Sequence, residues 1–364
     1  MNLLSNLAGS IPTHKVSVKA LTYLYPGSPP AFSYSDIPLP VKPNQILIKV
    51  KCAALNNIDV KETLNPAMWA VPGEKGIGRD FSGVVEECGG DIKGLKIGDR
   101  VCGFSHRIGT ISSHIVLDVP SDAIIKIPDN LSFEEGAAFP LTFATAYQCF
   151  DLATMTSTNS AVCVLGGSTA TGMLAIQIAK KIYGIKHVVV TCSPSSEALM
   201  RDIGADFIID YKKVSNLSKA LQEILENEIE QGKKFHIVLD CLGGVEVLSH
   251  YKLLLEHKSA GSVYVTTEGD QEASSTVVEG SAKYIWNPRM LGRRVFGSLW
   301  GINYVVMNVS TKGDWKERAR EVLAPGKVKV IIDSIYDWNQ WPMAWEKQMS
   351  EASHGKLVLR IEEF

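Results

Sequence analysis

The segment 161–210 constrains the fold of this 364-residue chain more than any other part of it. An apolar run at 161–165 leads through a turn of small residues, Gly166 to Gly172, into a helical pattern. Further apolar runs at 187–192 and 207–210 flank a second helical pattern. This alternation predicts parallel strands joined by helices. Glycines let the turn approach a ligand closely, and the N-terminus of the helix that follows favours an anion such as a pyrophosphate.

Three more apolar runs, at 235–240, 261–266 and 294–299, follow at a similar spacing. The six runs, with helical patterns between most of them, predict the doubly wound six-stranded parallel sheet of a Rossmann domain. The turn is not a literal G-x-G-x-x-G, so a tight turn in another kind of α/β protein is the alternative to dinucleotide binding.

The end of the second predicted strand indicates which dinucleotide would bind. NAD sites usually carry an acidic residue there, about 20 residues after the glycine turn, to hold the ribose 2′-hydroxyl. This chain has instead Ser193, Ser195 and Ser196, and Tyr211 and Lys212 follow the third strand. Hydroxyls and a cation suit a 2′-phosphate, so we expect NADPH. The same serines would also cap the next helix, and the two roles are compatible.

Composition limits the partners of the chain. With 45% hydrophobic residues, 21% charged residues and a net charge of −2, it shows no sign of a nucleic-acid or anionic-membrane partner. No apolar run reaches membrane-spanning length. Residues 1–20 lack the apolar core of a secretory signal, and a mitochondrial transit peptide is the alternative to the cytoplasmic location that we expect. Seven cysteines without C-x-x-C spacing indicate a reducing compartment.

The regions on either side of the sheet differ from it. After a loose arm at 1–14, short strands predicted at 19–24, 45–55, 81–88, 99–104 and 112–118 indicate a compact β-barrel-like domain. A helix predicted at 131–150, with Ser132 as its N-cap, leads into the sheet. After residue 299 we expect helices at 314–323 and 338–350 and strands at 328–333 and 356–361, which pair back with the first domain. The predicted division is residues 141–299 for the Rossmann domain and residues 1–140 with 300–364 for the other.

Residues 54–59, A-L-N-N-I-D, resemble the A-x-N-x-x-D segment of zinc-free medium-chain dehydrogenases/reductases. Further matching segments lie in the expected order at 78–85, 98–101, 135–138, 145–147 and 204–206. The chain is similar to the quinone oxidoreductase (zeta-crystallin) branch from about residue 16 to 361. At 166–171 and 191–194 it most resembles fungal enoyl reductase-like members. The resemblance implies a GroES-like β-barrel domain beside the Rossmann domain.

The resemblance also implies that no zinc is bound. Zinc alcohol dehydrogenases hold the metal with Cys, His and Cys, and the matching positions are Asn56, Arg79 and about Leu141. The four-cysteine lobe is also absent, since only Cys88 and Cys102 lie in that region. Without a Lewis acid, conjugated acceptors fit better than alcohols. Hydride adds to carbon, and the charge moves to an oxygen that needs only hydrogen bonds.

Three residues are catalytic candidates through the resemblance. Asn56 would bind the substrate oxygen or the nicotinamide ribose, with a turn residue as the alternative. Lys61, where many quinone reductases have Tyr, would supply charge to an enolate or a carrier phosphate, with a solvated surface lysine as the alternative. Thr145 would lie near the nicotinamide carboxamide, with helix packing as the alternative.

Cofactor contacts are expected at the turn, at the strand ends and near the C-terminus. At Ser196 many family members have Lys, and Arg201 or Lys212 would have to compensate for its absence. The expected cofactor-binding residues are Gly167, Ser168, Thr169, Ala170, Thr171, Ser193, Ser195, Ser196, Tyr211, Cys241, Leu242, Thr266, Phe296, Ser298 and Lys356.

The sequence thus predicts a zinc-independent, NADPH-dependent oxidoreductase that transfers hydride to a quinone or an α,β-unsaturated carbonyl. One alternative is a trans-acting enoyl reductase for a carrier-bound polyketide. Another is a non-enzymatic, stress-related or membrane-associated protein that keeps the fold. The resemblance also suggests a homodimer, formed through the predicted edge strand at 294–299.

Overall fold

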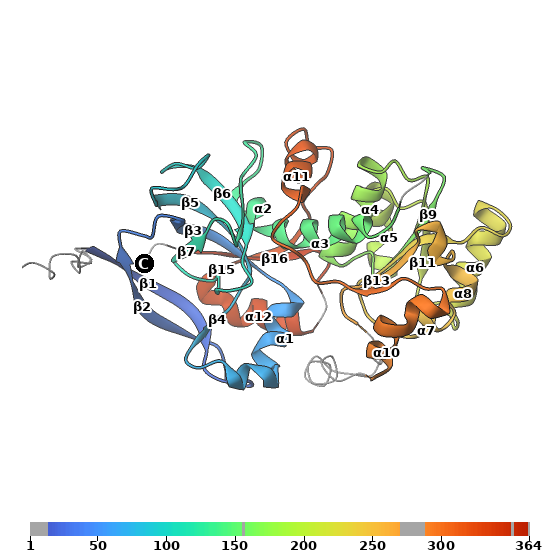
Figure 1. Ribbon diagram of the computed structural model, residues 1–364, viewed down its shortest axis with the longest axis horizontal. Helices are drawn as coiled ribbons and strands as arrows, with labels where there is room; N and C mark the ends of the chain where they lie inside the picture. Colours follow the sequence, from blue (N-terminus) through green and yellow to red (C-terminus); the bar gives the residue numbers. More distant parts are fainter. Residues whose placement is uncertain (1–13, 155–156, 270–287, 351–352, 363–364) are drawn as a thin grey trace, which may run out of the picture.

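The computed structural model describes residues 14–154, 157–269, 288–350 and 353–362. The predicted loose arm at 1–14 lies almost wholly outside these residues. Figure 1 shows two units side by side. The barrel-like unit contains strands β1–β8, β15 and β16, and the parallel-sheet unit contains strands β9–β14.

The parallel-sheet unit confirms the predicted six-stranded parallel sheet. Its strands are β9 (Ala161–Leu165), β10 (His187–Cys192), β11 (Phe207–Asp210), β12 (Phe235–Asp240), β13 (Val263–Thr266) and β14 (Tyr304–Val306). Their order is β11-β10-β9-β12-β13-β14, and every neighbouring pair is parallel. The order reverses between β9 and β12, and ligands of such sheets bind at the carboxyl ends beside that point.

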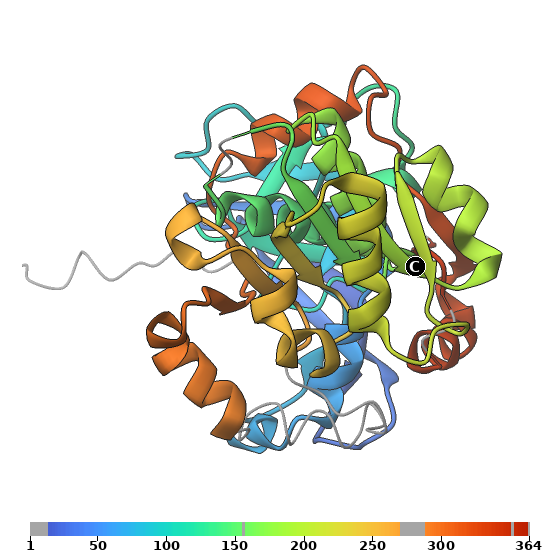
Figure 2. The same cartoon turned by 90° about the vertical axis from the view of Figure 1, so that its right-hand side faces the viewer.

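Helices cover both faces of this sheet, as Figure 2 shows. Successive residues of β9 enter opposite cores: Val162 and Val164 pack with α3 and α4, whereas Ala161 and Cys163 pack with α6 and α8. The strands are therefore rich in apolar residues on both faces, as expected for a sheet buried on both sides. The helical elements of this unit are α4 (Ala170–Lys181), η2 (Pro194–Ser196), α5 (Glu197–Asp202), α6 (Leu217–Ile224), η3 (Leu225–Ile229), α7 (Glu246–Ser249), α8 (Tyr251–Leu254), η4 (Lys258–Ala260), α10 (Pro288–Phe296) and η5 (Gly297–Trp300).

The prediction of a strand at 294–299 is wrong. These residues form the end of α10 and most of η5, and the sixth strand is β14. A short apolar run does not distinguish a strand from a helix turn, because the run is too short to show the period of either one. The edge strand that a dimer would use is accordingly Tyr304–Val306. The sheet also continues past residue 299, while the division into domains stays a prediction.

The barrel-like unit contains two sheets. One has the order β2 (Ala31–Leu39), β1 (His14–Tyr23), β4 (Lys75–Gly76). The larger one runs β15 (Ile332–Asp337), β16 (Lys356–Arg360), β3 (Gln45–Leu55), β5 (Asp80–Cys88), β6 (Arg100–Phe104), β8 (Ala123–Lys126), and β7 (His114–Asp118) also pairs with β3. The antiparallel pairing of β16 with β3 confirms that the end of the chain returns to the first domain. The strand predicted at 328–333 lies instead at Ile332–Asp337.

The helix predicted at 131–150 is divided in two at Pro140, which has no N–H to continue the first helix. The parts are α2 (Phe133–Ala138) and α3 (Pro140–Asp151). Ser132 is the N-cap of α2, as predicted: its hydroxyl accepts from the Glu135 N–H at 3.1 Å, and the Glu135 carboxylate accepts from the Ser132 N–H at 2.8 Å. The remaining helical elements are α1 (Asn57–Leu64), η1 (Pro66–Ala70), α11 (Trp315–Leu323), η6 (Trp338–Gln340) and α12 (Trp341–Met349).

The cap at Ser132 gives a stability prediction. Ser132→Ala removes the hydroxyl acceptor and should lower the free energy of unfolding by about 1 kcal/mol. Ser132→Asp keeps an acceptor at the same place and should stay within about 0.5 kcal/mol of the parent protein. Urea denaturation followed by circular dichroism measures both, and equal losses in the two variants would contradict the capping role.

Candidate functional site

The glycine turn after β9 is fastened to the end of β10. The Gly166 N–H donates to the Thr191 hydroxyl at 2.9 Å, and the Gly167 N–H donates to the Thr191 carbonyl at 2.9 Å. Gly166 has a φ of 80°, in the left-handed region that favours glycine. A Cβ on Gly167 would lie 2.0 Å from a methyl carbon of Val190, so a side chain cannot be placed there without moving β10.

The first turn of α4 packs directly on this glycine turn. Thr169 is the N-cap: its hydroxyl accepts from the Gly172 N–H at 3.0 Å and donates to the Gly166 carbonyl at 2.8 Å. A Cβ on Gly172 would lie 2.4 Å from the Gly166 oxygen. Ser168, Ala170 and Thr171 are partly exposed. The residues present therefore fit a bound pyrophosphate, because partly exposed small side chains surround a helix N-terminus.

The carboxyl ends of β12 and β13 lie beside the turn. The Cys241 N–H donates to the Leu165 carbonyl at 3.0 Å, and burial raises the pKa of the Cys241 thiol to about 12. Leu242 is half-exposed, and a Cβ on Gly166 would come within 2.7 Å of its side chain. At the end of β13 the Thr266 hydroxyl accepts from the Glu268 N–H at 3.2 Å. The structure thus brings the expected residues Cys241, Leu242 and Thr266 to the same edge of the sheet.

The serines after β10 form a small polar cluster. The hydroxyl oxygens of Ser193 and Ser195 lie 2.9 Å apart, and the Ser196 hydroxyl lies 3.2 Å from Nδ1 of His354. Tyr211 is half-exposed and follows Asp210, the residue that pairs with the end of β10. The Lys212 ammonium lies 6.0 Å from the centroid of the Tyr211 ring.

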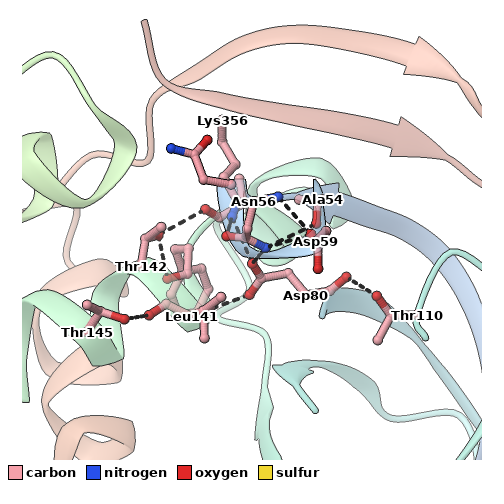
Figure 3. Close-up of polar contacts among 12 residues, drawn as sticks. Ala54, Asn56, Asp59, Asp80, Thr110, Leu141, Thr142, Thr145 and Lys356 are labelled. Atoms are coloured by element: carbon pink, nitrogen blue, oxygen red, sulfur yellow. Dashed lines mark hydrogen bonds and ion pairs between the residues drawn. The ribbon is translucent and has the colours of Figure 1, made fainter. Parts of the chain in front are cut away.

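Asn56 and Lys356, both expected at the site, meet in a buried polar cluster around Asp80 (Figure 3). The Lys356 ammonium donates to Oδ2 of Asp80 at 2.8 Å and also to Oδ1 of Asn56. The Asn56 amide donates to the same Asp80 oxygen at 3.0 Å. The side chains of Lys356 and Asp80 are only 3% and 0% exposed, so this ion pair is closed to water.

Asp80 also fixes the beginning of α3. Its second carboxylate oxygen, Oδ1, accepts from the Leu141 N–H at 2.8 Å, at the end of the helix that attracts negative charge. Its carbonyl accepts from the Thr110 hydroxyl at 2.8 Å. One carboxylate therefore connects β5, β16, the beginning of α1 and the beginning of α3.

Asp59 lies behind Asn56 as its partner in a capping box. One carboxylate oxygen of Asp59 accepts from the Asn56 N–H at 2.8 Å, and the other, Oδ1, is buried without a described hydrogen-bond partner. Burial raises the pKa of Asp59 to about 7, and the Arg79 cation opposes this shift. Arg79 itself pairs with Glu62 and contacts His106.

The other two catalytic candidates make structural contacts. The Thr145 hydroxyl donates to the Leu141 carbonyl at 2.7 Å, one helical turn earlier in α3. The Lys61 ammonium pairs with Glu268, which follows β13 in the other unit. Both side chains of that pair are 15% exposed. The catalytic roles of Asn56, Lys61 and Thr145 remain predictions.

Phe296 and Ser298 lie in helical segments, not on a strand. Phe296 ends α10, is half-exposed, and has its ring 6.4 Å from that of Trp300; Ser298 lies within η5. Trp300 and Leu299 line an open groove of about 650 Å³ with α7 and α8. Contact of Phe296 and Ser298 with a cofactor stays a prediction.

The chain is similar in sequence to dehydrogenase family models and to curated yeast proteins. The alcohol dehydrogenase GroES-like domain model matches residues 42–129, and the zinc-binding dehydrogenase model matches residues 203–359. Protein AST1 of Saccharomyces cerevisiae is 30% identical over 389 residues, which cover 96% of this chain and 89% of the relative. The chain belongs to the medium-chain dehydrogenase/reductase family. Members of this family are oxidoreductases that bind a nicotinamide cofactor.

Solved structures agree with this assignment at the level of the fold. A quinone oxidoreductase from Coxiella burnetii superposes with a TM-score of 0.75 at 23% identity, covering 95% of this chain and all of that one. The CurK enoyl reductase superposes with a TM-score of 0.74 at 19% identity, covering 95% of this chain and 99% of that one. The predicted GroES-like and Rossmann architecture of a quinone oxidoreductase-like family member is confirmed.

Two features are absent from the described part of this family member. Within residues 14–154, 157–269, 288–350 and 353–362, no group of three or more His, Cys, Asp or Glu side chains could hold a metal ion. Over the same ranges, no helix combines the length and apolarity needed to cross a membrane.

Sequence reasoning did not identify several residues of the site. Thr191 ties the glycine turn to β10, and the only signal was its place at the end of an apolar run. Glu268 and His354 meet their partners across 207 and 158 residues of chain, and no local pattern reports such a distance. The Asp80–Lys356 pair had no local signal either, because Asp80 precedes the strand predicted at 81–88 and lies 276 positions from Lys356.

The buried ion pair gives a prediction for stability. Lys356→Met should lower the free energy of unfolding by about 3 to 5 kcal/mol, because the Asp80 carboxylate is left buried without its cation. The double variant Lys356→Met with Asp80→Asn should recover most of that loss. Urea denaturation measures both, and a double variant less stable than the single one would contradict the charge-based explanation.

Asp59 gives a prediction for pH. Its pKa is raised from 3.8 to about 7, so the unfolded chain releases this proton at lower pH than the folded chain does. The stabilising contribution is complete below pH 4 and is lost as pH rises to about 7. Asp59→Asn should therefore reduce the fall in unfolding free energy between pH 4.5 and 7.

Part of the fall in unfolding free energy should remain in Asp59→Asn. Burial also raises the pKa of Asp240 to about 6, so this residue too loses a stabilising contribution as pH rises. Denaturant titrations at several pH values measure the slope. An unchanged slope in Asp59→Asn would show that Asp59 is ionised throughout this range.

Proposed function

We propose that this protein is a zinc-independent, NADPH-dependent reductase that transfers hydride to a quinone or an α,β-unsaturated carbonyl. The observation that carries the proposal is the end of β10. There the clustered hydroxyls of Ser193, Ser195 and Ser196 stand where an NAD site would have a carboxylate. A carboxylate would repel a 2′-phosphate, whereas hydroxyls can donate hydrogen bonds to it.

The arrangement of the two units supports a cofactor lying along the carboxyl ends of the strands. The turn at Gly166–Gly172 and the beginning of α4 would hold the pyrophosphate. The edge formed by Cys241, Leu242 and Thr266 would hold the nicotinamide half. When bound, the cofactor supplies the hydride.

The chain's own residues would then position the acceptor. Asp80 and Lys356 hold Asn56 and the first turn of α3 in fixed places, because each of these groups is hydrogen-bonded to the pair. Residues at the zinc-ligand positions of related dehydrogenases, Asn56 and Arg79, are engaged with protein partners. An oxygen that gains charge at this site would have to be stabilised by hydrogen bonds.

The structure weakens the case for a carrier-binding role of Lys61. Its ammonium is paired with Glu268 and only 15% exposed, so it does not offer an open positive patch to a carrier phosphate. We therefore favour small free acceptors. Pantetheine thioesters stay in the acceptor panel, because they test the alternative of an enoyl reductase for a carrier-bound polyketide.

The test of this function is a fluorescence titration with NADPH and NADH, followed by NADPH oxidation assays with quinones, enones and pantetheine thioesters. We expect micromolar NADPH binding, weaker NADH binding and turnover of quinones or enones. Cofactor binding without turnover of any acceptor, or no binding of either cofactor, would contradict the proposal and favour a non-enzymatic role. Turnover of thioesters alone would favour the enoyl reductase alternative.

The serine cluster gives a sharper prediction. The double variant Ser193→Ala with Ser195→Ala should raise the Kd for NADPH about a hundredfold, since each of the two lost hydrogen bonds to a phosphate costs about 1.5 kcal/mol. The Kd for NADH should change less than about twofold. Ser259→Ala is the matched control, because η4 precedes β13 and so lies at the opposite edge of the sheet. Equal weakening of both cofactors would show that the serines do not face the 2′-position.

A further inference from the structure

The serine cluster touches a residue from the other unit. Nδ1 of His354 lies 3.2 Å from the hydroxyl of Ser196, across 158 residues of sequence. Ser196 is buried, whereas His354 is exposed and stands in the segment between α12 and β16. The His354 N–H donates to the Asp333 carboxylate at 2.6 Å, which holds its backbone against β15. The imidazole therefore reaches from the barrel-like unit to the end of β10.

The cluster itself contains only neutral groups. A phosphate monoester carries nearly two negative charges at neutral pH and is bound most strongly by hydrogen bonds from cations. Two cations near this strand end are already paired, Arg201 with Glu197 at 2.9 Å and Lys213 with Asp210 at 3.4 Å. A third, Lys212, lies 6.0 Å from the centroid of the Tyr211 ring and makes no described hydrogen bond to the serines. Among the described hydrogen-bond partners of these serines, His354 is the side chain that can become positive.

We propose that His354 determines cofactor choice: protonated, it binds the 2′-phosphate of NADPH held at the Ser193–Ser196 cluster, so that the preference for NADPH over NADH rises as the residue takes up a proton. This inference rests on the proposed use of NADPH. The charge that distinguishes NADPH from NADH would then come from the barrel-like unit, whereas the rest of the expected cofactor site lies mainly in the parallel-sheet unit.

Several charged side chains on the elements of the two contacts of His354, Asp333 and Ser196, and on the helices next to them are described in pairs. Asp333 of β15 is paired with Lys347 of α12. Glu197 of α5 is paired with Arg201 of the same helix. Asp202, also of α5, is paired with Lys329 at 3.4 Å.

Carboxylates and basic groups in such pairs keep their charges between pH 6.5 and 8, whereas histidine is the side chain that commonly changes charge in this range. The 2′-phosphate begins to lose its second charge near pH 6, which sets the lower limit of the useful range.

The experiment is a fluorescence titration of the full chain with NADPH and with NADH at pH 8.0, 7.2 and 6.5. In the parent protein, the ratio of the Kd for NADH to the Kd for NADPH should rise about five- to tenfold from pH 8.0 to 6.5. A tenfold change corresponds to about one pKa unit of interaction between the imidazole and the bound phosphate. His354→Gln can still hydrogen-bond Ser196 but cannot become charged, so its ratio should be low and constant. His354→Lys carries a permanent charge, so its ratio should be high and constant.

His187→Gln is the matched control, because His187 begins β10 and so lies at the opposite edge of the sheet from its carboxyl end. It should keep the pH dependence of the parent protein. Three outcomes would overturn the proposal: a pH dependence that survives in His354→Gln, a change by the same factor for both cofactors, and no pH dependence in the parent protein. A pH dependence that survives in His354→Gln, or none in the parent protein, would not contradict the proposed use of NADPH. Failure to bind either cofactor would contradict both proposals.

Discussion

The buried ion pair between Lys356 and Asp80 is the interaction on which the arrangement of the site depends. An ion pair in the protein interior is tolerated only when further hydrogen bonds satisfy both charges. Here the Asn56 side chain contacts both charges, and the Leu141 N–H contacts the carboxylate. The two charged residues are 276 positions apart, so the pair ties β16, which is paired with β3 by its backbone, to the beginning of β5.

This constraint extends from the barrel-like unit into the parallel-sheet unit. Asp80 holds the beginning of α3, α3 packs on α4 within one shared hydrophobic core, and α4 begins at the glycine turn. Polar contacts add to this connection at the periphery. An example is the pair of Lys61 with Glu268. A candidate cofactor site and a candidate acceptor site are thus positioned by the same two helices.

Local sequence patterns predicted much of the framework. The strand predicted at 45–55 agrees with β3 to the residue, and Ser132 caps α2 because capping depends on contacts within four residues. The failure at 294–299 has a physical reason. An apolar run of that length satisfies a strand and a helix equally. In the structure the run continues a helix whose Met290 packs in the same core as Ile302 and Tyr304, while Val295, Phe296 and Leu299 stay exposed. The turn could be recognised from its glycines, because these positions leave no room for a side chain. A Cβ on Gly167 would overlap Val190, and a Cβ on Gly172 would overlap the Gly166 oxygen.

The sequence by itself determined the alternation of strands and helices, the glycine turn, the lack of an acid after β10 and the family. These are properties of short segments or of their order along the chain. Only the tertiary structure decided which charges meet: Lys356 with Asp80, Lys61 with Glu268, and His354 with Ser196. The reason is that a hydrogen bond or ion pair depends on distances of about 3 Å. Residues separated by 158 to 276 positions reach such distances only after the sheets have formed.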